Sequence, residues 1–164
     1  MVFDQMNEVQ SQASTTATEA LVDVSRGLWV MQILGHASEG ALDRLEIYVK
    51  LQPGSSELPM EEVLTLFICD ETCMQLRFDE AKADSTTFGC DLVLAASDVA
   101  DEWPSLHVLG TKDIAKITIT DDDGDLDIGS MEHVTMTFMP ASGLGLGYGF
   151  SIPQMTQDGW FTIR

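Results

Sequence analysis

The alternation of apolar and polar side chains within residues 42–51 constrains this chain more than any other feature. The apolar positions are Leu45, Ile47, Val49 and Leu51, and the intervening positions are Arg44, Glu46, Tyr48 and Lys50. Successive side chains of a β-strand point to opposite faces of a sheet, so this period predicts a strand with one buried face. The preceding segment 27–35 is apolar and bounded by glycines, and the connection 36–41 contains Gly40. The two segments together predict an antiparallel pair.

Further short strands are predicted along the chain, separated by turn signals. Residues 63–69 and 74–78 predict a second hairpin after the break at 52–56, and the closing strands are predicted at 115–120, 133–139 and 148–152, with 160–163 as a candidate fourth. This spacing indicates a mostly β domain, an antiparallel Ig-like sandwich or barrel. Strands do not alternate with helices, so a parallel sheet is not expected.

Two stretches carry weaker signals. Within residues 79–113, short strands are candidates at 92–96 and 107–109, and residues 98–104 are expected to form an exposed loop. Glycines alternate through residues 143–149, between a predicted strand and the next. They do not open a helix as a dinucleotide loop would, and favour a turn or the close approach of a neighbouring chain at a sheet edge.

The N-terminal segment has a different period. Apolar side chains recur there at steps of three and four, at Met6, Val9, Ala13, Ala17, Ala20 and Val24. This pattern predicts a helix over residues 4–26, followed by a β-domain over residues 27–164. The stripe is too narrow to hold a helix alone in water, so it is expected either to pack on a partner helix or to fray.

The net charge of −19, from 27 acidic and 8 basic residues, limits the partners of this chain. Nucleic acids and anionic lipids require clustered Lys and Arg, whereas the lysines here are scattered singly. Concentrated external salt would screen the self-repulsion, which favours an extracellular, salty or divalent-rich environment. The sequence contains no apolar run of about 20 residues and no signal peptide, so no membrane span is expected within it.

Residues suited to catalysis are few. His36, His107 and His133 accompany no nucleophile-elbow, phosphate-loop or zincin pattern, which argues against an enzyme. The three cysteines are too few for a disulfide framework and lack the spacing of a zinc site. Cys69 and Cys73 could face each other across a hairpin as a disulfide, or be small buried residues.

An Asp-rich turn is the most suggestive site for a ligand. Its candidate ligands occupy positions 1, 3, 5 and 12 of a calcium loop: Asp121, Asp123, Asp125 and Glu132. Hard cations such as Ca²⁺ prefer clustered carboxylate oxygens. However, Leu126 stands where that loop needs glycine, so a solvated acidic turn is the alternative.

Two stretches of the sequence resemble the archaellins, the structural subunits of the archaeal motility filament. The family has a Ser-Gly-Leu junction between helix and sheet, an I/L-D-K/R-L strand start and a P-G-S turn. The corresponding residues here are Ser25-Arg26-Gly27-Leu28, Leu42-Asp43-Arg44-Leu45 and Pro53-Gly54-Ser55. The Asp-rich turn, the strand at 133–139 and the ending Phe150-Ser151-Ile152-Pro153 resemble the family more loosely. Archaellins begin with a strongly hydrophobic helix, and this sequence resembles them only from the polar second half of it.

The resemblance implies a mechanical, non-enzymatic role. Residues 1–26 would be the end of the helix that packs in the filament core, and the β-domain would form the filament surface of a helical homopolymer outside the cell. Other archaellum or surface-layer proteins are further implied partners. Two alternatives stay open: an archaellum stator or accessory protein of similar fold, and an extracellular calcium- or glycan-binding β-module.

Overall fold

A computed structural model describes residues 27–69, 72–80, 83–84, 86–120, 128, 132–141 and 145–163. The predicted helix at 4–26, with its stripe residues, lies outside these ranges. Eleven strands fall within them, which confirms the mostly β prediction. They are β1 (Leu28–Ser38), β2 (Ala41–Leu51), β3 (Leu58–Pro59), β4 (Leu64–Cys69), β5 (Thr72–Phe78), β6 (Thr87–Leu94), β7 (Val108–Leu109), β8 (Ile114–Thr120), β9 (His133–Met139), β10 (Leu146–Ser151) and β11 (Gly159–Thr162). No described helix is long and apolar enough to cross a bilayer.

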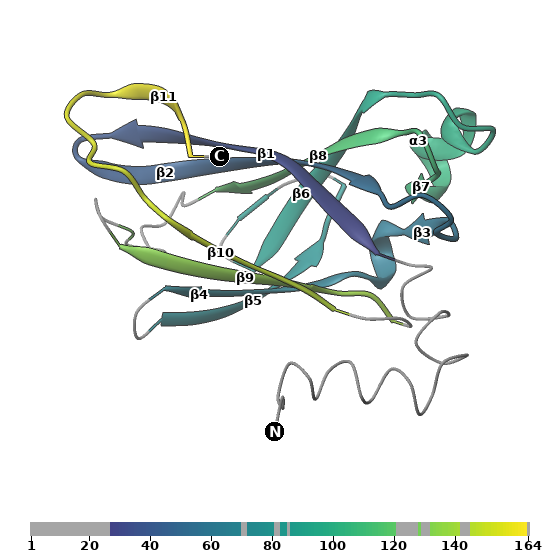
Figure 1. The fold of residues 1–164 in the computed structure, drawn as a ribbon, viewed down its shortest axis with the longest axis horizontal. Helices are drawn as coiled ribbons and strands as arrows, with labels where there is room; N and C mark the ends of the chain where they lie inside the picture. The colour runs from purple at the N-terminus through teal and green to yellow at the C-terminus, as the bar shows by residue number, and fades with distance from the viewer. Residues whose placement is uncertain are drawn as a thin grey trace.

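Nine of the described strands form one curled sheet in the order β10-β9-β4-β5-β6-β8-β2-β1-β11 (Figure 1). The first four make one layer of a sandwich, and the last five make the other. β3 and β7 pair separately at one end of the molecule. β10 and β11 are therefore the two edge strands of the described sheet.

The predicted antiparallel pair at the start of the β-domain is confirmed by the β1–β2 hairpin. The burial of β2 alternates from Arg44 to Leu51 as the sequence pattern requires. The turn is only Glu39-Gly40, shorter than the predicted connection, and both residues have positive φ, 53° and 84°. Such turns match the twist of the flanking strands, and glycine adopts them without a steric cost.

The layers meet at a parallel pair, which the sequence did not predict. β5 and β6 pair in parallel through Arg77 with Thr87 and Phe78 with Phe88, whereas the other strand pairs of the described sheet are antiparallel. The pairing covers only two register positions. It therefore joins the edges of the two layers without creating a parallel sheet.

The predicted exposed loop at 98–104 contains two short helices. These are η2 (Ala100–Glu102) and α3 (Trp103–Leu106), and a further 3-10 turn, η1 (Met60–Glu62), precedes β4. Pro104 lies in the first turn of α3, where its missing N–H would have no partner in any case. The loop prediction was wrong in conformation, although these residues are largely exposed.

The core lies between the two layers. Its largest fully buried side chains include Phe67 of β4, Phe138 of β9, Phe88 of β6 and Ile117 of β8. Because the layers contribute side chains from opposite directions, burying this apolar surface holds the sandwich closed.

Candidate functional site

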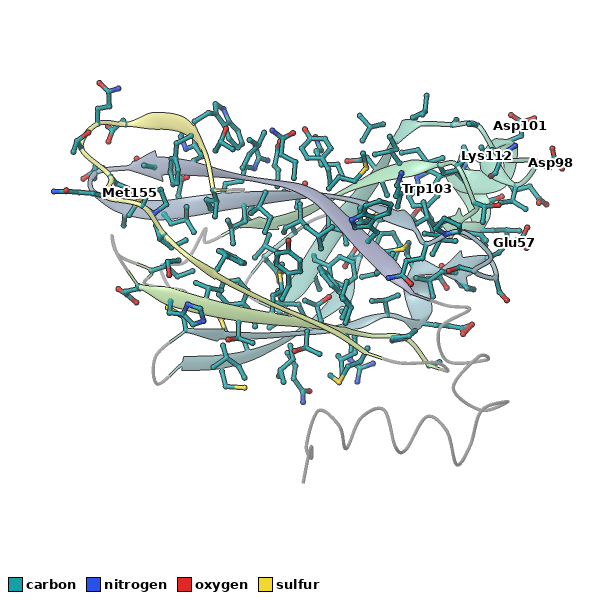
Figure 2. All side chains as sticks on the ribbon, viewed as in Figure 1. Glu57, Asp98, Asp101, Trp103, Lys112 and Met155 are labelled. Carbon is teal, nitrogen blue, oxygen red and sulfur yellow. The ribbon has the colours of Figure 1, made fainter. Side chains whose placement is uncertain are left out.

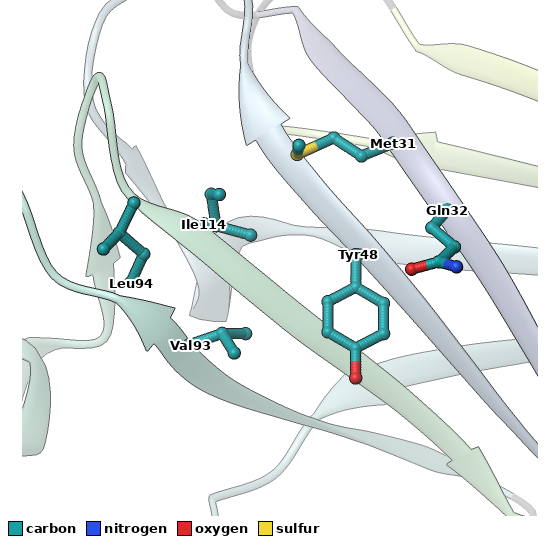
Figure 3. Close-up of a pocket in the computed structure, with 6 residues that line it drawn as sticks. All are labelled: Met31, Gln32, Tyr48, Val93, Leu94 and Ile114. Atoms are coloured by element: carbon teal, nitrogen blue, oxygen red, sulfur yellow. The ribbon is translucent and has the colours of Figure 1, made fainter.

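An open apolar groove marks the outer face of the layer formed by β6, β8, β2 and β1 (Figure 3). Its volume is about 420 Å³. It is lined by Met31, Gln32, Tyr48, Val93, Leu94 and Ile114. Val93 is 55% exposed, Leu94 48% and Met31 44%, which is unusual for large apolar side chains grouped on one face.

Two irregularities in strand pairing bring these side chains to the surface. The register of β1 against β2 shifts between Val30 and Gln32, and that of β6 against β8 shifts between Leu92 and Leu94. A bulge inserts an extra residue, so neighbouring side chains can emerge on the same face. Met31 with Gln32, and Val93 with Leu94, are accordingly exposed pairs at opposite sides of the groove.

The face around the groove is balanced in charge. Its basic side chains are Arg44, Lys50 and Lys116, and its acidic ones are Asp43, Glu46 and Asp91. Lys50 Nζ lies 4.6 Å from the centre of the Trp29 ring, and Lys116 Nζ lies 3.7 Å from Glu46 Oε2. In a chain with 27 acidic and 8 basic residues, this face is unusual because it carries as many basic as acidic side chains.

A second, polar hollow of about 280 Å³ lies on the same layer near β11. Trp160, which is 51% exposed, packs edge-on against His36 at 4.9 Å between ring centres. His36 Nδ1 is 2.7 Å from Asp43 Oδ1, and Arg44 and Thr120 complete the lining.

The histidines do not assemble a catalytic group among the described residues. His36 lies in β1, although the sequence placed it in a turn, and its polar partner is Asp43. His133 begins β9 as expected, with Nδ1 3.3 Å from Ser151 Oγ. His107 is buried and follows α3 in a left-handed conformation, with φ of 49°, where a short strand was expected. None of the three is in hydrogen-bonding contact with both a hydroxyl and a carboxylate, as a nucleophile–base–acid arrangement requires.

The predicted calcium ligands lie mostly outside the described residues. Of the four, only Glu132 is described, and it accepts a hydrogen bond from Cys69 Sγ at 3.0 Å. In the described part of the chain, no three His, Cys, Asp or Glu side chains form a group able to hold a metal. The calcium site therefore stays a prediction.

Of the two alternatives for Cys69 and Cys73, the disulfide is not formed, and the small buried residue is confirmed for Cys69 only. Cys69 pairs with Thr72 across the hairpin, and Cys73 pairs with Ile68. Cys69 is buried and Cys73 is exposed, so the two thiols point to opposite faces of the sheet and form no disulfide. Cys90 is buried too, and burial, reinforced by the charge of Asp91, raises the pKa of its thiol. Buried thiols with raised pKa values are unreactive.

The apolar groove was not predicted from the sequence. The signal for the groove in the sequence was the run of consecutive apolar residues 92–94, because a strand whose side chains alternate between two faces cannot bury all three in the core. The sheet edge predicted at the glycine-rich segment is confirmed for Gly147 and Gly149, which lie on the edge strand β10.

The fold matches the solved structures of an archaeal flagellin and an archaeal flagellum. The crystal structure of archaeal flagellin FlaB1 from Methanocaldococcus jannaschii superposes with a TM-score of 0.71 at 19% identity, covering 84% of this chain and 96% of that one. The chain has the fold of an archaeal flagellin. The archaeal flagellum of Methanospirillum hungatei gives a TM-score of 0.60 at 15% identity over 98% of this chain and 84% of that one.

The archaeal flagellin fold is accompanied by a match in sequence. Flagellin A of Methanococcus voltae is 40% identical over 58 residues, which is 35% of this chain and 26% of that protein. No protein-family model matches the chain. The resemblance to archaellins proposed from the sequence is therefore confirmed by an independent similarity in fold.

Proposed function

We propose that this chain is a structural, non-enzymatic subunit of an archaeal motility filament. Residues 1–26 would pack with equivalent helices of other copies in the filament core, and the β-domain would form the filament surface outside the cell. The observation that carries the proposal is the agreement between the 58-residue match to Flagellin A and the superposition on FlaB1.

The physical properties of the β-domain suit such a role. Its described residues form two layers of strands around one buried apolar core. The high negative charge keeps filament surfaces apart and soluble in a salty medium. The charge-balanced face leaves one surface on which copies can approach without strong repulsion.

Filaments sheared from archaeal cells that express this chain test the proposal. The chain should be an abundant component of the fibres by mass spectrometry, and antibodies against the β-domain should decorate them along their whole length in electron microscopy. Deleting its gene should abolish fibres or swimming. Retention of the chain at the cell envelope, with normal fibres lacking it, would favour an accessory protein and overturn the proposal.

A further inference from the structure

Four side chains form one row across the outer face of the layer that contains β8, β2, β1 and β11. Trp160 of β11 is directly opposite His36 of β1. His36 is in turn opposite Arg44 of β2, which is opposite Thr120 of β8. Residues paired in this way direct their side chains to the same face of a sheet, so the four line the polar hollow together. The row lies at the end of the molecule that carries Met155, on the segment leading into β11 (Figure 2).

A bulge in β2 adds a fifth polar side chain to this hollow. Consecutive residues of β1 pair with Arg44 and Leu42, so Asp43 between them is the extra residue of the bulge. Asp43 Oδ1 accepts a hydrogen bond from His36 Nδ1 at 2.7 Å. The Asp43 side chain is nevertheless 42% exposed. One carboxylate oxygen therefore orients His36, while the side chain still reaches solvent.

The aromatic end of the hollow is held in place before any ligand arrives. Trp160 packs edge-on against His36, with ring centres 4.9 Å apart, yet it stays 51% exposed. Asp158 Oδ1 accepts a hydrogen bond from Glu39 N at 2.9 Å, which ties the residue before β11 to the β1–β2 turn. Because the ring and its neighbours are already ordered, a ligand loses less free energy to ordering them.

The side chains of the hollow disfavour several classes of ligand. An apolar ligand would desolvate Asp43 and Arg44 without giving them hydrogen bonds. A strong anion would meet one guanidinium, but also Asp43 and the nearby carboxylates of Glu39 and Asp158. An organic cation would face Arg44. Among the described residues, no group of three His, Cys, Asp or Glu side chains could hold a metal ion. A neutral ligand with many hydroxyl groups and one apolar face fits this combination.

We propose that this hollow binds one ring of a neutral saccharide. The C–H face of the ring lies on Trp160, and its hydroxyl groups donate to Asp43 and accept from Arg44. The volume of about 280 Å³ is below the range of roughly 300–1,000 Å³ that holds drug-sized ligands, which suits a single ring. The inference goes beyond the proposed function and does not depend on it.

Saturation-transfer NMR on the full chain tests the proposal. The probes are the methyl glycosides of glucose, galactose, mannose and N-acetylglucosamine. At least one should receive saturation, mostly at the protons of one ring face, because that face contacts the indole. Trp160→Ala should weaken its binding on the order of ten-fold. The matched control is Trp29→Ala, which should bind as the unaltered chain does. Trp29 is 50% exposed on the same layer, with Lys50 Nζ 4.6 Å from its ring centre.

Arg44→Met tests the site without touching β11. Methionine keeps an apolar stem but has no N–H donors, and Arg44 is exposed, so binding should weaken while the melting temperature stays unchanged. Unaltered binding by Arg44→Met would overturn the inference. So would an equal loss in the two tryptophan variants, saturation of tetramethylammonium in place of the sugars, or no saturation of any glycoside. None of these outcomes bears on filament formation, so the proposed function is tested separately.

Discussion

Asp113 and Ser97 are joined by two short hydrogen bonds, although sixteen positions separate them in the chain. The Ser97 backbone N–H donates to Asp113 Oδ1 at 2.7 Å, and the Ser97 hydroxyl donates to Oδ2 at 2.6 Å. Asp113 is fully buried, and Ala96 N and Gly110 N also donate to its carboxylate, at 2.8 and 2.9 Å. One buried carboxylate thus ties the segment that follows β6 to the segment that precedes β8.

Replacing Asp113→Asn should destabilise the β-domain. The amide NH₂ would face backbone donors in place of one carboxylate oxygen, leaving buried polar groups unpaired at a cost of about 1–3 kcal/mol. Urea unfolding of the purified domain measures this loss. Asp98→Asn is the control, because Asp98 is exposed. Equal stability of the two variants would contradict the role assigned to Asp113.

The same carboxylate should make stability depend on pH. Burial raises the pKa of Asp113, but the hydrogen bonds from Ser97, Ala96 and Gly110 outweigh it and hold the pKa below the ordinary 3.8. A depressed folded-state pKa contributes stability that is present above the unfolded value and lost as pH falls through the folded value. The stability difference between the unaltered domain and Asp113→Asn should therefore narrow below about pH 4. Urea midpoints between pH 7 and pH 3 measure it, and a constant difference would contradict the prediction.

A methyl group at Gly35 should loosen the edge strand β11. A Cβ there would lie 2.6 Å from Phe161 Cζ and 2.9 Å from Leu42 Cδ1, so the packing of β11 on β1 must shift. Overpacking of this kind costs about 1–3 kcal/mol. The matched control is Gly89→Ala, another strand glycine, whose Cβ would meet no atom nearer than 3.8 Å. Thermal unfolding should rank Gly35→Ala well below Gly89→Ala, and the reverse order would refute this packing.

The three cysteines should differ in reactivity. Cys73 is exposed and should react with a maleimide in the folded domain, whereas Cys69 and Cys90 are buried and should react only after unfolding. Peptide mass spectrometry after native labelling identifies the modified thiols. Detection of a Cys69–Cys73 disulfide in the native protein would contradict the placement of these side chains on opposite faces.

Removal of metal tests the predicted calcium loop. If Asp121, Asp123, Asp125 and Glu132 bind Ca²⁺, the melting temperature should fall in excess EDTA and recover on adding Ca²⁺, since a ligand bound only by the folded state stabilises it. Asp123→Asn should weaken the recovery. An unchanged melting curve in EDTA would leave the solvated acidic turn as the correct interpretation.

Outside residues 79–113, the sequence by itself determined most of the strands and which of their side chains face the core. Within that stretch it did not, since β6 covers Thr87–Leu94 where the candidate strand was 92–96. The alternation in β2, the hairpin of β4 with β5, and the bounds of β9 follow from a period of two, because a strand directs successive side chains to opposite faces. The junction residues and the P-G-S turn were also sufficient for the resemblance to archaellins. These are local patterns, which a sequence displays directly.

Only the tertiary structure decided how the strands pair and what the pairing exposes. The parallel pairing of β5 with β6 joins the two layers into one sheet. Two register shifts place Met31, Val93 and Leu94 on the outer face of their layer. The chain supplies apolar residues at these positions, but whether each is core or surface depends on partner strands distant in sequence. Pairing energies are shared between segments, so no local pattern specifies the groove.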